Sequence, residues 1–170
     1  MYLTRLPAIS GDDYHIHQIT RKIFPGDQRV LFQRTDDSIV VISESPAVDA
    51  TIVSEKVDLT RYEEGKSYSF FVRLNPSKRD SKTHKRVGHE PDYVKAWITE
   101  QLNKVGIDAR FQYIREVTHH SLKSDTKISH ASVLCFGSLT IKDHKSFCKV
   151  LAKGIGKGKG LGFGLLNVFG

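Results

Sequence analysis

The feature that most constrains how this chain folds is its C-terminal stretch, residues 154–170. Seven of the 13 glycines lie there, alternating first with lysines and then with large apolar residues. Glycine accepts positive φ and lets another segment approach the backbone closely. A flexible tail would explain a mixture of glycine and lysine, but it has no reason to end in the apolar run 163–169. We therefore predict a backbone-lined loop that runs into a docked final strand.

This loop is also basic, because Lys157 and Lys159 alternate with its glycines. The glycines are Gly154, Gly156, Gly158, Gly160, Gly162 and Gly164. Consecutive backbone N–H groups in such a loop can form a concavity for phosphate oxygens. The spacing fits neither the P-loop nor the G-x-G-x-x-G motif, and a helix precedes the loop, whereas those motifs follow a strand. The pattern favours phosphate binding, but not that of a mononucleotide.

The charge balance points to a polyanionic partner. Lysine and arginine number 26 against 19 acidic residues, a formal net charge of +7, as in proteins that bind nucleic acid or an anionic membrane surface. No apolar stretch approaches the ~20 residues of a membrane span, and the N-terminus lacks the regions of a signal peptide. We expect a cytoplasmic protein that is not attached to a membrane, with Cys135 and Cys148 as buried thiols in a reducing compartment.

The first half of the chain predicts several strands and one helix. The strands are expected at residues 2–9, 30–34, 39–42 and 68–74. The helix can be capped by Ser10 or Asp12, and Pro25 must end it. Its core stripe consists of isoleucines at helical spacing, namely Ile16, Ile19 and Ile23. Residues 44–66 are polar and poorly periodic, so no element is assigned to them.

The second half predicts a helix that Pro91 opens and Gly106 closes, and a short helix capped by Asp143. Strands are expected at residues 107–117 and 129–141 and at the C-terminal end of the chain. Two tandem ferredoxin-like units, each with βαββαβ order, explain both halves and place the chain in the α+β class. We expect these units at residues 1–76 and 77–170, with the second helix of the first unit short or missing.

The candidate for acid–base chemistry is one imidazole on the first helix. Tyr14, His17 and Arg21 recur at helical spacing and share one edge. A histidine can act as general base or general acid near neutral pH. RNA cleavage needs little more, because the 2′-OH of RNA can attack the adjacent phosphorus. Tyr14 would orient the attacking group or share in the proton transfer, and Arg21 or the neighbouring Lys22 would stabilise the phosphoryl charge.

Other chemistry has less support in the sequence. No histidine or cysteine cluster has the spacing of a metal site, and no nucleophile elbow is present, so no metal or cofactor is expected. A basic segment lies between the two halves, where an RNA could contact both, although such segments are often solvated loops. Its cationic residues are Arg73, Lys78, Arg79, Lys82, Lys85 and Arg86.

Four motifs, in order along the chain, carry a resemblance to a known family. They are Met1-Tyr2-Leu3-Thr4; Tyr14-x-x-His17-Gln18 with Phe24-Pro25; Phe71-Val72-Arg73-Leu74-Asn75-Pro76 followed by Lys78-Arg79 and Lys85-Arg86-Val87; and Gly154-Ile155-Gly156 through Lys159 to Gly162-Phe163-Gly164-Leu165-Leu166. Together they resemble the CasE family of type I-E CRISPR systems. Ala96-Trp97 and Phe136-x-Gly-x-Leu139 add weaker support.

This resemblance implies a double ferredoxin-like fold and a metal-independent endoribonuclease that cuts precursor CRISPR RNA within each repeat. Its products would carry a 5′-OH on one side and a 2′,3′-cyclic or 3′-phosphate on the other. By position, His17 matches the catalytic histidine of the family and Tyr14 its neighbouring tyrosine. The family binds the repeat stem-loop, stays on the 3′ hairpin of the product and joins the Cascade surveillance complex, so we expect a monomer before assembly. Lys157 stands where proline is common.

Two other interpretations use the same residues. In a non-catalytic, RNA-hairpin-binding subunit of the same fold, His17 would pack or hydrogen-bond and nothing would be cut. An unrelated basic scaffold protein would show no preference for a hairpin over a scrambled RNA. The variant His17→Ala separates the enzyme from the non-catalytic subunit, because only the enzyme would lose turnover while keeping its RNA.

Overall fold

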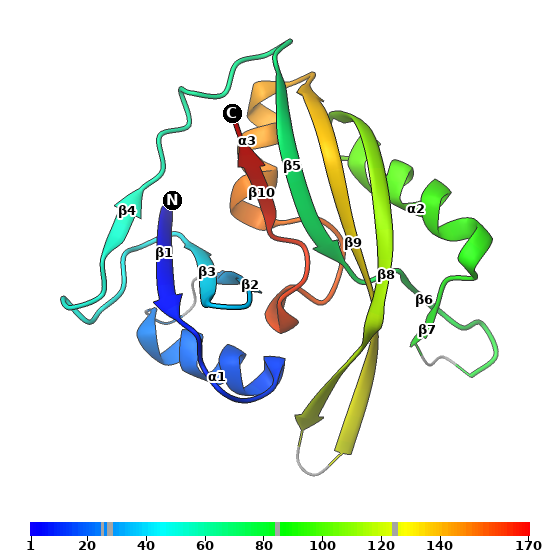
Figure 1. Cartoon of the computed structure of the whole chain (residues 1–170), viewed down its shortest axis with the longest axis horizontal. Coiled ribbons are helices and arrows are strands. Elements are labelled where there is room, and N and C mark those ends of the chain that lie inside the picture. Colours follow the sequence, from blue (N-terminus) through cyan, green and yellow to red (C-terminus); the bar gives the residue numbers. More distant parts are fainter. Residues whose placement is uncertain (25, 27–28, 84–85, 124–125) are drawn as a thin grey trace.

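The computed structural model describes residues 1–24, 26, 29–83, 86–123 and 126–170. Its strands form two four-stranded antiparallel sheets and one small two-stranded sheet (Figure 1). The two large sheets are consecutive along the chain, and the predicted pair of tandem ferredoxin-like units is confirmed. None of the described helices is long and apolar enough to cross a membrane.

The first unit holds one helix against its sheet. Its elements are β1 (Tyr2–Pro7), α1 (Asp13–Ile23), β2 (Leu31–Arg34), β3 (Ser38–Ser43) and β4 (Ser54–Lys56). The sheet order β2-β3-β1-β4 is that of a ferredoxin-like unit. Residues 44–66, all of which are described, contain no helix, so the second helix of this unit is missing as predicted.

Local sequence signals set the position of α1. Asp12 Oδ1 accepts a hydrogen bond from the backbone N–H of His15 at 2.8 Å, so Asp12 rather than Ser10 is the N-cap. Ile16 is completely buried against one face of the sheet, where Phe24 and Phe32 complete the core. Ile19 and Ile23, expected in the same stripe, are only half-buried, and Thr20 is buried in their place.

The second unit repeats the topology with both helices present. Its elements are β5 (Ser67–Leu74), α2 (Pro91–Asn103), β8 (Ile107–Lys123), β9 (Thr126–Ile141), α3 (His144–Lys153) and β10 (Leu166–Phe169), in the sheet order β10-β5-β9-β8. A small hairpin, β6 (Ser77–Arg79) and β7 (Arg86–Gly88), lies between β5 and α2. Apolar side chains from α2, α3 and the sheet form one large core. Asp143 caps α3 as predicted, accepting from the N–H of Ser146 at 2.6 Å.

β5 belongs to the second sheet, where it pairs with β9 and β10. Phe70, Val72 and Leu74 alternate along it and are buried in the second core. The predicted division at residues 76 and 77 would put this strand in the first unit, whereas the second sheet begins at Ser67. The strand is drawn to the second unit because its apolar face packs against that core.

The hairpin of β8 and β9 is longer than the sequence predicts. The predicted strands cover residues 107–117 and 129–141, but the backbone pairing continues to Lys123 and Thr126, with an irregularity between Glu116 and His119. Figure 1 shows this extension projecting beyond the rest of the sheet. Strand pairing needs only backbone N–H and C=O groups, so a polar stretch that lacks an apolar face can still extend a hairpin.

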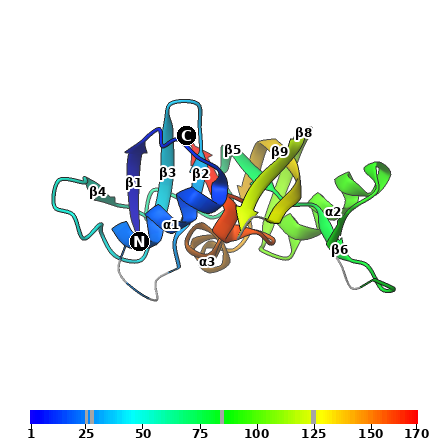
Figure 2. The ribbon, with the colours of Figure 1, turned by 90° about the horizontal axis from the view of Figure 1, so that it is seen from below.

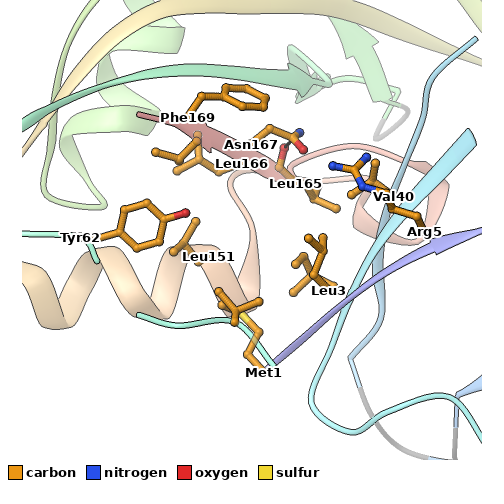
Figure 3. A pocket seen from close by; sticks show the side chains of 13 residues that line it. Met1, Leu3, Arg5, Val40, Tyr62, Leu151, Leu165, Leu166, Asn167 and Phe169 are labelled. Atoms are coloured by element: carbon orange, nitrogen blue, oxygen red, sulfur yellow. Dashed lines mark hydrogen bonds between the residues drawn. The ribbon is translucent and has the colours of Figure 1, made fainter. Parts of the chain in front are cut away.

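The two units meet through the C-terminal segment. Leu165 packs with Leu31 and Ile42 on the face of the first sheet that α1 does not cover. Asn167 Nδ2 donates to Gln33 Oε1 at 2.7 Å and so joins β10 to β2. A cavity of about 110 Å³ lies in this junction, lined largely by apolar side chains from both units (Figure 3). The segment that sequence reasoning singled out therefore holds the units together.

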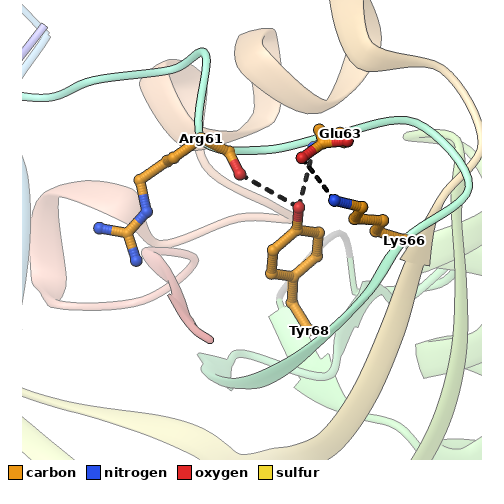
Figure 4. Close-up of polar contacts among 4 residues, drawn as sticks. All are labelled: Arg61, Glu63, Lys66 and Tyr68. Atoms are coloured by element: carbon orange, nitrogen blue, oxygen red, sulfur yellow. Dashed lines mark hydrogen bonds and ion pairs between the residues drawn. The ribbon is translucent and has the colours of Figure 1, made fainter.

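The connection between the units is fixed by a tyrosine at the start of β5. The hydroxyl of Tyr68 accepts from the N–H of Glu63 at 2.8 Å and donates to the carbonyl of Arg61 at 3.2 Å (Figure 4). Lys66 pairs with the Glu63 carboxylate at 2.6 Å. These contacts tie the end of the connection to the second unit.

The two cysteines differ in burial. Cys135 is completely buried in the second core, and burial raises the pKa of its thiol to about 12. Cys148, which was also expected to be buried, is only half-buried on α3. Both thiols are free.

Candidate functional site

The glycine-rich loop is closed at its base by backbone hydrogen bonds. The N–H of Ile155 donates to the carbonyl of Gly164 at 2.8 Å, and the N–H of Gly164 donates to the carbonyl of Arg73 at 2.7 Å. Gly164 has φ +83°, and a β-carbon at this position would overlap the carbonyl oxygen of Ile155. The loop is therefore docked on β5, as predicted, and its closure requires glycine at residue 164.

The tip of this loop lies against the first unit. A short 3₁₀ helix, η1 (Lys159–Leu161), contacts both α1 and β2, and Figure 2 shows it beside α1. A β-carbon at Gly160 would lie 3.3 Å from Cε1 of His17, and one at Gly162 would lie 3.1 Å from the ring of Phe32. The alternating glycines thus bring the C-terminal backbone close to the candidate histidine.

His17 is half-buried on α1 beside this backbone. Its Nδ1 is buried and has no hydrogen-bond partner among the described residues. Burial lowers the pKa of the imidazole below its usual value, and the positive charge of Arg21 lowers it further. His17 is therefore held toward its neutral form, which is the form that can accept a proton.

An open groove of about 340 Å³ runs past His17. Its described lining residues are His17, Arg21, Gly26, Arg29, Val30, Lys159 and Gly160. Three of these residues are cations, and they come from three different segments. None of the described lining residues is acidic. Burial lowers the pKa of Lys159, and the nearby charges of Arg29 and Lys153 lower it further. The groove is thus electropositive and suited to an anion.

The structure brings together only part of the predicted catalytic set. His17, Arg21 and Lys159 line one groove. Tyr14 is half-buried and Lys22 is exposed on the same helix, and neither is among the described lining residues. Arg29, which precedes β2, was missed. The only sequence signal for it was a basic residue shortly after the Pro25-Gly26 helix stop, where the chain must turn back toward the sheet.

The predicted basic segment lies mainly on the small hairpin. Lys78 and Arg79 are exposed on β6, and Lys82 is exposed in the turn that follows. Arg73 is half-buried on β5, and Arg86 begins β7. Lys85 lies outside the described residues. The segment therefore presents at least three cations at the surface.

Lys157 is exposed, and its charge acts on His89, the residue that follows β7. Burial lowers the pKa of His89, and the charges of Lys78 and Lys157 add to the effect, while Glu100 opposes it. Lys157 is not among the described groove residues, whereas Lys159 is. The two lysines of the glycine loop therefore extend the positive charge in two directions, one toward His17 and one toward β6.

No cluster of three or more histidine, cysteine, aspartate or glutamate side chains among the described residues could hold a metal ion. Within the same part of the chain, the polar groups that line the groove are nitrogen donors and one imidazole. The described cationic side chains of the groove therefore offer hydrogen-bond donors to an anion.

The fold and site define a double ferredoxin-like protein with a basic, histidine-containing groove where its units meet. The profile of a family described as CRISPR associated protein matches residues 3–169. The chain belongs to this family, which confirms the resemblance seen in the sequence. No curated protein sequence matches the chain.

Solved structures of CRISPR proteins share the fold over the whole chain. One is the endoribonuclease Cse3 bound to a 19-nucleotide RNA, with 22% identity, a TM-score of 0.83 and 100% of both chains covered. Another is Cas6e from Escherichia coli K-12, with 25% identity, a TM-score of 0.78 and 99% of both chains covered. A third is a chain of a CRISPR RNA-guided surveillance complex, with 18% identity, a TM-score of 0.78 and 99% of both chains covered.

Proposed function

We propose that this protein binds the repeat stem-loop of precursor CRISPR RNA, cleaves it and then stays on the 3′ hairpin as a subunit of Cascade in the cytoplasm. Membership of the CRISPR-associated family supports the biological setting. Similar chains include an RNA-bound endoribonuclease and a component of a surveillance complex. The observation that carries the catalytic part is the position of His17, held toward its neutral form in a groove with three cations.

The proposed reaction is attack by the ribose 2′-OH on the adjacent phosphorus. His17 takes the proton of the 2′-OH, the new bond from O2′ to phosphorus forms, and the bond from phosphorus to O5′ breaks. The departing O5′ takes a proton from water and becomes a 5′-OH, while the other product ends in a 2′,3′-cyclic phosphate that water can open to a 3′-phosphate. The RNA supplies its own nucleophile, so the proposed step does not use a metal.

The burial of Nδ1 suggests which nitrogen of His17 acts. For Nε2 to accept the proton, the neutral ring must carry its hydrogen on Nδ1, the atom that is buried without a partner among the described residues. We assign the proton transfer to Nε2. Arg21 and Lys159, which line the same groove, would stabilise the charge that builds up on the phosphoryl oxygens, and Tyr14 would orient the attacking group.

RNA recognition would rest mainly on shape and phosphate contacts, because A-form grooves expose little sequence to side chains. Exposed Lys78, Arg79 and Lys82 would bind the stem. Lys157 would continue this surface onto the glycine loop, and Lys159 would reach the phosphates near His17. Arg73, Lys85 and Arg86 complete the predicted set of RNA-binding cations.

The test compares wild-type protein with His17→Ala and with His15→Ala, using the repeat RNA of the CRISPR array from the same genome in the presence of EDTA. His15 is an exposed histidine on the same helix, so it is a matched control. Removal of a general acid or base lowers rates by about 10²–10⁴-fold. We expect cleavage at one bond by wild type and His15→Ala, with a 5′-OH product, and a loss of that size in His17→Ala with RNA binding retained.

Other outcomes would change the assignment. Tight hairpin binding without cleavage by any of the proteins would make this a non-catalytic RNA-binding subunit. Cleavage that persists in His17→Ala would remove the histidine from the mechanism. Equal affinity for the hairpin and a scrambled RNA would leave only a basic scaffold.

A further inference from the structure

Arg29 lines the same groove as His17, although it comes from the segment before β2 and not from α1. The positive charge of Arg29 is one of the causes that lower the pKa of Lys159. The two cations therefore lie close enough to repel each other. Arg21 adds a third positive charge to the same groove.

Such crowding of like charges opposes folding unless an anion offsets it. The repulsion involves Arg29 from the first unit and Lys159 from the C-terminal loop, with Lys153 on α3 contributing as well. None of the described residues that line the groove is acidic. An anion such as a phosphodiester is the chemical class that this groove fits.

An arginine is better suited than a lysine to hold such a ligand in one orientation. Its guanidinium is planar, stays protonated and can donate two parallel hydrogen bonds to two oxygens of a phosphate. Lys159 is a compact point charge whose protonated form is disfavoured by its surroundings. Lys22, one of the two cations that the sequence suggested for this role, is exposed and is not among the described lining residues.

We propose that Arg29, together with Lys159, binds the non-bridging oxygens of the phosphodiester on which His17 acts. This inference rests on the proposed function, since it concerns the same reaction. When the bond from O2′ to phosphorus forms and before the bond to O5′ breaks, the two non-bridging oxygens carry an additional negative charge. Arg29 meets that charge with its N–H groups, while His17 holds the proton taken from the 2′-OH. The role of Arg29 is greater in the transition state than in the bound RNA.

The test measures single-turnover cleavage of the repeat hairpin at saturating protein, for wild type, Arg29→Gln, Arg29→Lys and Arg110→Gln. Arg110 is exposed on β8 and is not among the described groove residues, so it serves as the matched control. Loss of one preorganised donor to a developing oxyanion costs about 10²–10³-fold, so we expect a fall of about 100-fold in Arg29→Gln. The cleavage rate of Arg29→Lys should lie between those of Arg29→Gln and wild type, and the rate of Arg110→Gln should match wild type.

A second measurement separates binding from cleavage. The affinity for a repeat hairpin with a 2′-deoxy sugar at the cleavage position, which cannot react, is measured as a function of salt. Loss of one phosphate contact lowers the salt slope by about one unit, so Arg29→Gln should show this loss together with a several-fold weaker affinity. Thermal unfolding of each variant shows whether it is folded. If Arg29→Gln does not fold, Arg29→Lys, which keeps the positive charge, takes its place in both measurements.

The outcomes distinguish this inference from the proposed function. If wild type cleaves, His17→Ala does not, and Arg29→Gln cleaves within twofold of wild type, then the role of Arg29 is refuted while the function stands. If wild type does not cleave, the proposed cleavage function is refuted. The affinity for the deoxy hairpin then tests the phosphate contact of Arg29 by itself, because an unchanged affinity and salt slope in Arg29→Gln would refute that contact as well.

Discussion

A substitution series in the glycine loop tests whether its closure positions the site. Gly164→Ala would place a β-carbon on the carbonyl oxygen of Ile155 and would force a side chain into φ +83°. The left-handed conformation costs about 1–2 kcal/mol. Two backbone hydrogen bonds at this residue, one accepted from the N–H of Ile155 and one donated to the carbonyl of Arg73, each contribute about 0.5–1.5 kcal/mol. Together these terms predict a destabilisation of roughly 2–5 kcal/mol.

Two other glycines in the loop serve as controls for this variant. Gly156 has φ +72°, but its nearest neighbour is 3.9 Å from a built β-carbon, so Gly156→Ala tests backbone strain alone. Gly160 carries no positive-φ strain, and its β-carbon would press on the ring of His17 at 3.3 Å. Gly160→Ala should leave stability nearly unchanged and lower cleavage by up to about tenfold, because a misplacement of about 1 Å costs about 10²-fold.

The assay for the series is thermal unfolding followed by circular dichroism, with single-turnover cleavage in parallel. In a domain of this size 1 kcal/mol shifts Tm by about 2–4 °C. We expect a fall in Tm of about 4–20 °C in Gly164→Ala and a smaller fall of about 2–8 °C in Gly156→Ala. A Tm of Gly164→Ala equal to that of Gly156→Ala would refute the reasoning, because the loop would then tolerate the loss of its closure.

Two further predictions concern charge in the groove and on the loop. Arg21 lowers the pKa of His17, so Arg21→Gln should raise that pKa. The acidic limb of the pH–rate profile should then move to higher pH. An unchanged position of this limb would show that His17 is not the base. Lys157→Ala and Lys159→Ala should each weaken RNA binding and lower the salt slope by about one unit, but only Lys159→Ala should also slow cleavage at saturating protein, because it alone lines the groove. Unchanged affinity in the double variant would remove the loop from the RNA interface.

Much of the fold could be predicted because its signals are local. The cap at Asp12, the helix opened by Pro91 and the cap at Asp143 each act within one turn of the helix that they start. The docked C-terminal segment was also predictable, since its apolar run has to be buried somewhere. Phe163 and Leu165 are indeed buried in the structure.

What could not be predicted depends on long-range packing. The alternation of Phe70, Val72 and Leu74 shows that β5 has a buried face, but it does not say which of two cores will bury it. The extension of β8 and β9 depends on backbone pairing, which the side-chain pattern does not predict. Arg29 has no periodic or motif signal, and only the contact of β2 with η1 makes it part of the groove.

The position of the groove makes the site a property of both units. His17 and Arg29 come from the first unit, whereas Lys159 and Gly160 come from a loop whose base hydrogen-bonds to β5 in the second unit. The hydrogen bond from Asn167 to Gln33 and the packing of Leu165 on Leu31 fix the distance between these two sources. A change at the junction can therefore alter catalysis without touching a catalytic side chain. The glycine loop thus links the stability of the interface between the units to the geometry around His17.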